Sequence, residues 1–113
     1  MYEVGWYEGN SIRQTHPVGR KKPNSLGLYD MHGNVWEFCL DWYDEYPSEA
    51  VIDPTGPEDP PYSDKAPGRV IRGGSWNRDA GKCRAAGRDK IDPSNGRSTN
   101  DTYGFRVVFV PEQ

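Results

Sequence analysis

The chain has 113 residues, is 34% hydrophobic, and carries 14 Lys and Arg against 17 Asp and Glu, for a formal charge of −3. This length fits one small domain, and the acidic balance, with a pI of about 5.3, excludes the basic surface that nucleic-acid binding requires. No apolar run approaches the roughly 20 residues that cross a bilayer, and no signal peptide is visible at the N-terminus. A cytoplasmic location without membrane association is therefore the default expectation.

An aromatic core is predicted, because four Trp and seven Tyr stand in a chain poor in aliphatic residues, and each aromatic buries roughly 150–250 Å². The 13 Gly and 10 Pro predict many turns, beginning with residues 1–27. In residues 35–43 large side chains alternate with polar ones, which predicts a half-buried strand. Its inner face is expected to carry Trp36, Phe38, Leu40 and Trp42.

The second half of the chain alternates loops and strands. Five prolines within residues 53–68 predict a long surface loop. Residues 69–76 predict a strand that bends at Gly73 and Gly74, and residues 77–103 are polar and irregular, with a short strand near residues 83–86. Residues 104–110 predict the last strand. Together these elements predict an α+β domain with a loop-rich antiparallel sheet and little helix.

Three sequence strings occur in order along the chain. Residues 26–37 read Leu-Gly-Leu-Tyr-Asp-Met-His-Gly-Asn-Val-Trp-Glu, residues 69–76 read Arg-Val-Ile-Arg-Gly-Gly-Ser-Trp, and residues 104–108 read Gly-Phe-Arg-Val-Val. In this order they resemble the C-terminal half of the formylglycine-generating enzyme (sulfatase-modifying factor) family, whose fold is a variant of the C-type lectin fold. The resemblance implies a single domain over residues 1–113 that lacks the N-terminal half of the usual family domain.

The resemblance to the family's enzymes breaks at their catalytic position. Those enzymes carry two cysteines, five residues apart, just after the Gly-Gly-Ser-aromatic string, where the thiolates bind copper and attack the target. Here residues 77–82 contain no cysteine, and neither Arg nor Lys can replace the soft thiolate that Cu(I) requires. Cys83 resembles the family's later, non-catalytic cysteine. We therefore expect no copper and do not favour an enzyme.

Asp30, Gly33, Val35 and Glu37 match, position by position, a calcium site of the family's enzymes. The two carboxylates and the backbone carbonyls of Gly33 and Val35 are the hard oxygen ligands that Ca²⁺ prefers. The resemblance implies a structural metal that ties down a loop with few apolar contacts. The alternative is a metal-free turn in which Asp30 accepts local N–H groups and Glu37 pairs with an arginine.

Cys39 and Cys83 have two alternative states. They form a disulfide, worth roughly 3–4 kcal/mol, or they stay buried thiols, which is the usual state in the cytosol. Four arginines at family positions are expected to act as ion-pair partners more than as anion-binding residues; they are Arg72, Arg84, Arg88 and Arg106. The residues expected in the core are Trp36, Trp42, Trp76 and Phe105, with the floor of a ligand pocket as the alternative place for Trp76.

Residues 77–103 form a polar, chemically mixed stretch between two glycine-bent, aromatic strings. Adaptable polar side chains on a rigid scaffold suit recognition, so we expect a non-catalytic domain that binds a protein or small-molecule ligand. The stretch is similar to that of the variable proteins of diversity-generating retroelements, which share this fold and diversify exposed positions between the two strings. The expected ligand-binding residues are Asn77, Arg78, Asp79, Lys82, Gly87, Asp89, Asn95, Arg97, Asn100 and Tyr103.

Other functions are weighed against this one. The alternative is a formylglycine-generating-type oxidase, or its partner subunit, in sulfatase maturation, and it rests entirely on the resemblance. Lectin activity is not supported, because the proline-containing tripeptides of calcium-dependent lectins are missing. A short, loop-rich domain is also expected to cover exposed apolar surface, either by forming a homo-oligomer or by retaining a partner segment.

Overall fold

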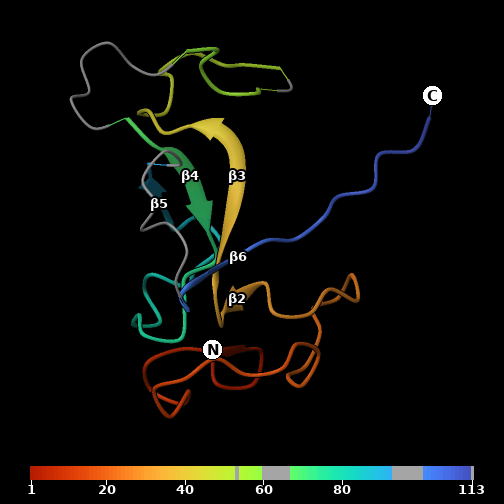
Figure 1. The fold of residues 1–113 in the computed structure, drawn as a ribbon. Helices are drawn as coiled ribbons and strands as arrows, with labels where there is room; N and C mark the ends of the chain where they lie inside the picture. Colours follow the sequence, from red (N-terminus) through yellow and green to blue (C-terminus); the bar gives the residue numbers. More distant parts are fainter. Residues whose placement is uncertain (53, 60–66, 93–100, 113) are drawn as a thin grey trace.

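The computed structural model describes residues 1–52, 54–59, 67–92 and 101–112. The described residues contain no helix, and they form short strands joined by long loops (Figure 1). The strands are β1 (Gly5–Trp6), β2 (His32–Gly33), β3 (Trp36–Trp42), β4 (Arg69–Arg72), β5 (Arg88–Ile91) and β6 (Tyr103–Gly104). The prediction of a loop-rich domain with little helix is confirmed.

The strands form two sheets. One pairs β1 with β2, and the other has the order β5-β4-β3-β6. In the larger sheet β4 runs antiparallel to both β3 and β5, whereas β6 runs parallel to β3. The β1–β2 pair is also parallel. The larger sheet is therefore mixed, since it contains both antiparallel and parallel strand pairs.

The core is small and lies where β3, β4 and the following loop meet. Its buried apolar residues are Trp36, Val70, Ile71 and Cys83. Val70 and Ile71 are adjacent on β4 and therefore point to opposite faces, and because both are buried, both faces of this strand are covered. Of the four expected core aromatics, only Trp36 is buried, at 3% exposure, while Trp42 and Trp76 are half-buried.

The predicted inner face of β3 is wrong beyond its first residues. Leu40 is 91% exposed and Phe38 is also exposed. The ladder between β3 and β4 shifts register between Phe38 and Trp42, which interrupts the simple alternation. Trp42 is instead covered by the guanidinium of Arg69, 3.9 Å from its ring.

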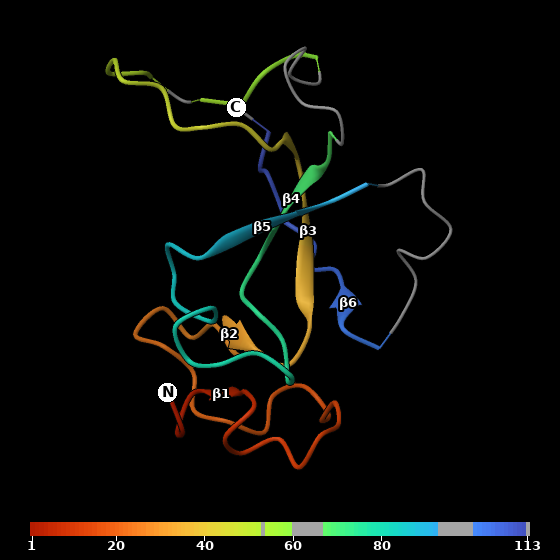
Figure 2. The ribbon, with the colours of Figure 1, turned by 90° about the vertical axis from the view of Figure 1, so that its left-hand side faces the viewer.

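The predicted last strand, residues 104–110, is also wrong. β6 ends at Gly104, and the following segment leaves the sheet as an extended tail (Figures 1 and 2). Phe105, which we expected in the core, is 81% exposed, and the apolar residues 107–110 are comparably exposed. No described segment covers this tail. The expected homo-oligomer stays a prediction.

Two further sequence expectations change. Residues 83–86 form turns, and the strand predicted there lies further on, as β5. Of the four family arginines, only Arg106 forms an ion pair with a described residue. Arg88 instead stacks on the rings of Tyr43 and Tyr46. No helix of the described part of the chain is long and apolar enough to cross a membrane.

Candidate functional site

The loop after β4 is held tightly from within. Gly73 and Gly74 have φ angles of 96° and 75°, in the left-handed region that favours glycine. Ser75 is fully buried, and its hydroxyl lies 2.6 Å from Oδ1 of Asn77. Successive backbone hydrogen bonds then close the turns, from the N–H of Arg78 to the Ser75 carbonyl and from the N–H of Lys82 to the Asp79 carbonyl, both 3.1 Å. This stretch is thus an ordered turn whose side chains point outward.

An N-terminal loop, residues 7–13, is fastened to the same turn. The N–H of Glu8 donates to the carbonyl of Arg78 at 2.9 Å, and the Ser11 hydroxyl donates to the carbonyl of Trp76 at 2.8 Å. The Trp76 indole N–H donates to the carbonyl of Asp101 at 3.0 Å, which holds the ring. Between the two loops lies a cavity of about 520 Å³, which we call the Trp76 cavity. Its lining residues are Glu8, Ser11, Arg13, Trp76 and Asn77.

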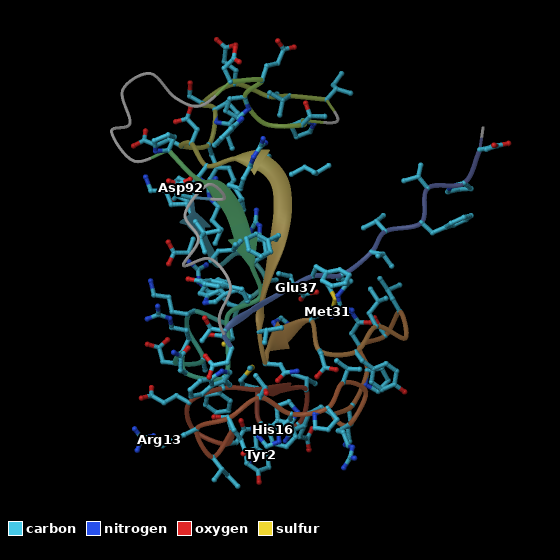
Figure 3. All side chains as sticks on the ribbon, viewed as in Figure 1. Tyr2, Arg13, His16, Met31, Glu37 and Asp92 are labelled. Atoms are coloured by element: carbon cyan, nitrogen blue, oxygen red, sulfur yellow. The ribbon has the colours of Figure 1, made fainter. Side chains whose placement is uncertain are left out.

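The rim of the Trp76 cavity carries an unusual backbone. Ile12 and Arg13 have φ angles of 56° and 57°, and Ile12 is 80% exposed. A β-branched residue in the left-handed region is a genuine outlier, costing of order 1–3 kcal/mol, and such outliers cluster at ligand-binding sites. Figure 3 shows Arg13 at the outer edge of this N-terminal layer. Arg13 lines the cavity, which also has an aromatic wall, and Ile12 precedes it in the chain.

The ten residues expected to bind a ligand are only partly brought together. Asn77 lines the Trp76 cavity, and the next residues of its turn, Arg78, Asp79 and Lys82, are exposed beside it. Asp89 is exposed on a different element, β5, and Tyr103 is half-buried on β6. The calls at Asn95, Arg97 and Asn100 lie outside the described residues.

Gly87 occupies a structural position. It is buried, and a Cβ there would lie 2.7 Å from the carbonyl oxygen of Lys82. The glycine therefore permits a close approach of two turns. Sequence reasoning also missed the opposite wall of the cavity, formed by Glu8, Ser11 and Arg13. No local pattern marks these residues, because they reach the site through contacts with a segment far along the chain.

The four residues expected to hold calcium line a second cavity, of about 250 Å³. Asp30, Gly33 and Asn34 all have positive φ, so the chain turns sharply between the two carboxylates. Oδ2 of Asp30 accepts the N–H of Gly19 at 2.8 Å. Oδ1 of Asp30 is buried and has no hydrogen-bond partner among the described residues. A buried, unpartnered carboxylate oxygen is costly unless something pairs with it.

Arg106 shares this second cavity. Its Nε donates to Oε1 of Glu37 at 2.6 Å, and one terminal nitrogen donates to the carbonyls of Tyr29 and Asp30. This ion pair is the one that the metal-free alternative anticipates for Glu37. No group of three or more His, Cys, Asp or Glu gathers in the described ranges, so a cation there depends on the two carboxylates and on backbone carbonyls.

Both cysteines are free thiols. Burial raises the pKa of Cys83, which lies under the Gly74 turn. Burial, followed by the charge of Asp41, raises the pKa of Cys39. A raised pKa keeps a thiol protonated and therefore a poor nucleophile and metal ligand. These two thiols do not fit a copper centre, and residues 77–82 supply no other.

Comparison with known proteins identifies the family of this chain. The chain matches the sulfatase-modifying factor enzyme 1-like domain over residues 2–110. It belongs to this family. The expected family and its C-type lectin-like fold are thereby confirmed.

The sulfatase-modifying factor relatives are of several kinds. The chain is 44% identical over 96 residues to the serine/threonine-protein kinase Pkn1 of Chlamydia trachomatis, covering 83% of this chain and 14% of that protein. It is 36% identical over 99 residues to the formylglycine-generating enzyme of Streptomyces coelicolor, covering 83% of this chain and 29% of that protein. Among solved structures, Treponema denticola variable protein 1 has a TM-score of 0.77 and 38% identity, covering 92% of this chain and 35% of that one. The chain thus spans between 14% and 35% of the length of these three proteins.

Proposed function

We propose that this chain is a non-catalytic binding domain whose ligand occupies the Trp76 cavity. The observation that carries the proposal is the cavity itself, about 520 Å³ with an indole wall and groups of both charge signs. Pockets of this size that combine an aromatic wall with a few polar groups are usual for ligand sites. The positive φ angles of Ile12 and Arg13 at its rim add to this support.

The finer proposal is that the exposed side chains of the 77–82 turn vary between versions of the protein. Its support is the similarity to Treponema denticola variable protein 1, together with a backbone that the turn holds through its own hydrogen bonds. Such a turn tolerates change at Arg78 and Lys82, because no described hydrogen bond uses these two side chains, whereas Oδ1 of Asp79 accepts the N–H of Lys82 at 3.0 Å. A near-identical template copy of this coding segment beside the gene would support the proposal, and its absence from the genome would contradict it.

The similarity to formylglycine-generating enzymes favours a second candidate, an oxidase of that type. The residues present do not fit its copper, because the turn lacks cysteine and the two remaining thiols are protonated and lie on different elements. Turnover of a cysteine-containing peptide by the copper-loaded chain would overturn the binding proposal.

A fragment screen by NMR tests the binding proposal. We expect fragments that bind to shift the Trp76 indole N–H signal and the backbone amides of Ser11 and Arg13. Trp76→Ala should abolish this response, while the matched change Trp42→Ala, which removes a half-buried indole outside the cavity, should leave it. Fragments that perturb only other regions would contradict the proposal.

Stability measurements test whether the side chains of the 77–82 turn are a recognition surface or are needed to hold the fold. Arg78→Ala and Lys82→Ala should each change the free energy of unfolding by less than about 0.5 kcal/mol, because both side chains are exposed. Ser75→Ala removes a fully buried hydroxyl that is bonded to Asn77 and should cost about 1–3 kcal/mol. Urea denaturation is the measurement. Equal losses at all three positions would show that the turn side chains hold the fold.

We also propose that calcium stabilises the chain through Asp30 and Glu37. Four oxygen donors around one cavity support this, together with the unpartnered Oδ1 of Asp30. Bound calcium would neutralise the charges of the two carboxylates and would have a structural role only. Arg106 weakens the site because its guanidinium already binds Glu37.

The calcium proposal is tested by melting. Calcium at 100 times its Kd should stabilise the fold by about 2.7 kcal/mol, so EDTA should lower the Tm and added Ca²⁺ should restore it. The double change Asp30→Ala, Glu37→Ala should lose the response, and Asp89→Ala, an exposed carboxylate elsewhere, should keep it. A Tm that is the same with and without chelator would refute the proposal.

A further inference from the structure

A third cavity, of about 340 Å³, lies between the end of β4, the 83–87 turn and the loop before β2. It does not share a residue with the Trp76 cavity. Its lining includes two guanidinium groups, Arg72 and Arg84, and one carboxylate, Glu37. Figure 3 shows Glu37 beside Met31, which also lines this cavity. The described lining therefore carries a net positive charge.

Both guanidinium groups retain donor capacity. Arg84 is exposed, and its guanidinium forms no ion pair or hydrogen bond with another described residue. Arg72 makes two long contacts, 3.5 Å to the carbonyl of Ala85 and 3.3 Å to the hydroxyl of Tyr46, both beyond the usual hydrogen-bond range. Arg72 is thus held loosely, and its N–H groups remain available to a better acceptor.

A third donor comes from the loop before β2. Oδ1 of Asn24 accepts the N–H groups of Leu26 and Leu28, at 2.9 and 3.0 Å. Two N–H donors require an acceptor, and only the oxygen of the side-chain amide accepts. These two bonds therefore fix which end of the Asn24 amide faces the loop. The Asn24 NH₂ group has no described partner and belongs to a side chain that lines the cavity.

The acceptors around the cavity are already engaged or do not compete strongly. Oε1 of Glu37 is bonded to Arg106 at 2.6 Å, which partly neutralises this carboxylate. Nδ1 of His32 lies 2.7 Å from the carbonyl of Cys83 and must donate, because a carbonyl only accepts. Neither residue is paired with Arg72 or Arg84. Within the described part of the chain, the two guanidinium groups consequently lack the carboxylate partner that such groups usually find.

We propose that this cavity binds a small carboxylate-bearing molecule. Its carboxylate would lie against the guanidinium of Arg84, with Arg72 and the Asn24 amide as further donors. A guanidinium matches the two oxygens of a carboxylate with two parallel hydrogen bonds. Met31 and Ala85 add apolar surface for a short alkyl substituent, which favours an organic acid over inorganic phosphate.

The test is an NMR titration of the whole chain with sodium propionate, sodium phosphate and sodium chloride at equal ionic strength. We expect propionate to produce saturable shifts at residues around the cavity, and chloride to produce none. Arg84→Gln should weaken propionate binding at least tenfold. The matched control Arg78→Gln, which removes the same charge from an exposed site outside the cavity, should change it less than twofold.

Two further measurements complete the test. Arg84→Lys should retain less than half of the affinity, because the ammonium cannot make the paired contact, and all variants should keep the wild-type Tm since Arg84 is exposed. Equal weakening by Arg84→Gln and Arg78→Gln, or a non-saturable response to propionate, would overturn the proposal. Phosphate that binds as tightly as propionate would overturn the assignment to carboxylates. None of these results depends on the Trp76 cavity.

Discussion

Replacing Gly74 by alanine is expected to lower the free energy of unfolding by about 2–5 kcal/mol. Gly74 has a φ of 75°, and a Cβ there would lie 2.5 Å from Sγ and 2.8 Å from Cα of Cys83. The left-handed backbone alone costs roughly 1–2 kcal/mol for an L-residue, and overpacking a buried turn adds roughly 1–3 kcal/mol. Together these costs are a large fraction of the about 5–15 kcal/mol that stabilises a typical domain.

Gly19→Ala is the matched control for this substitution. Gly19 has nearly the same φ, 76°, but nothing lies within 4 Å of the position that its Cβ would take. It should therefore lose only the backbone cost. The difference between the two variants in urea denaturation measures the contact between the Gly74 turn and Cys83. If the two variants lose equal stability, that close approach does not exist in solution.

The second large effect is expected at Trp36. This residue is 3% exposed and begins β3, where it pairs with Tyr103 of β6. Trp36→Ala removes the largest buried side chain of a small core, which typically costs about 3–5 kcal/mol. Chemical denaturation followed by circular dichroism would report the loss.

Leu40→Ala, on the same strand, is the control for Trp36. Leu40 is 91% exposed, so its truncation should stay within about 0.5 kcal/mol. A large loss at Leu40 would mean that something covers this face of β3 in solution, and a small loss at Trp36 would mean that the core lies elsewhere. Repeating the Leu40 measurement at several protein concentrations separates a covering second copy from intramolecular burial.

The sequence alone predicted the features that depend on local pattern. The alternation in residues 35–43 and the segment 69–76 each predicted a strand, and the structure has β3 and β4 there. The adjacent glycines after β4 predicted the bend, and both have positive φ angles in the structure. The three ordered strings identified the family. Backbone conformation and side-chain period are properties of consecutive residues, so they can be read along the chain.

The tertiary structure decided the features that depend on contacts between segments far apart in the sequence. The pattern showed that Leu40 and Phe105 are apolar, but burial requires a covering segment, and no described segment supplies one. The wall of the Trp76 cavity at Ser11 exists through a hydrogen bond across 65 positions of sequence. Arg88 was expected beside a carboxylate, yet two tyrosine rings of another loop reach it. Each of these contacts joins groups that are far apart in the sequence and that only the fold brings within a few ångströms. A pattern of neighbouring residues therefore cannot predict which groups will meet.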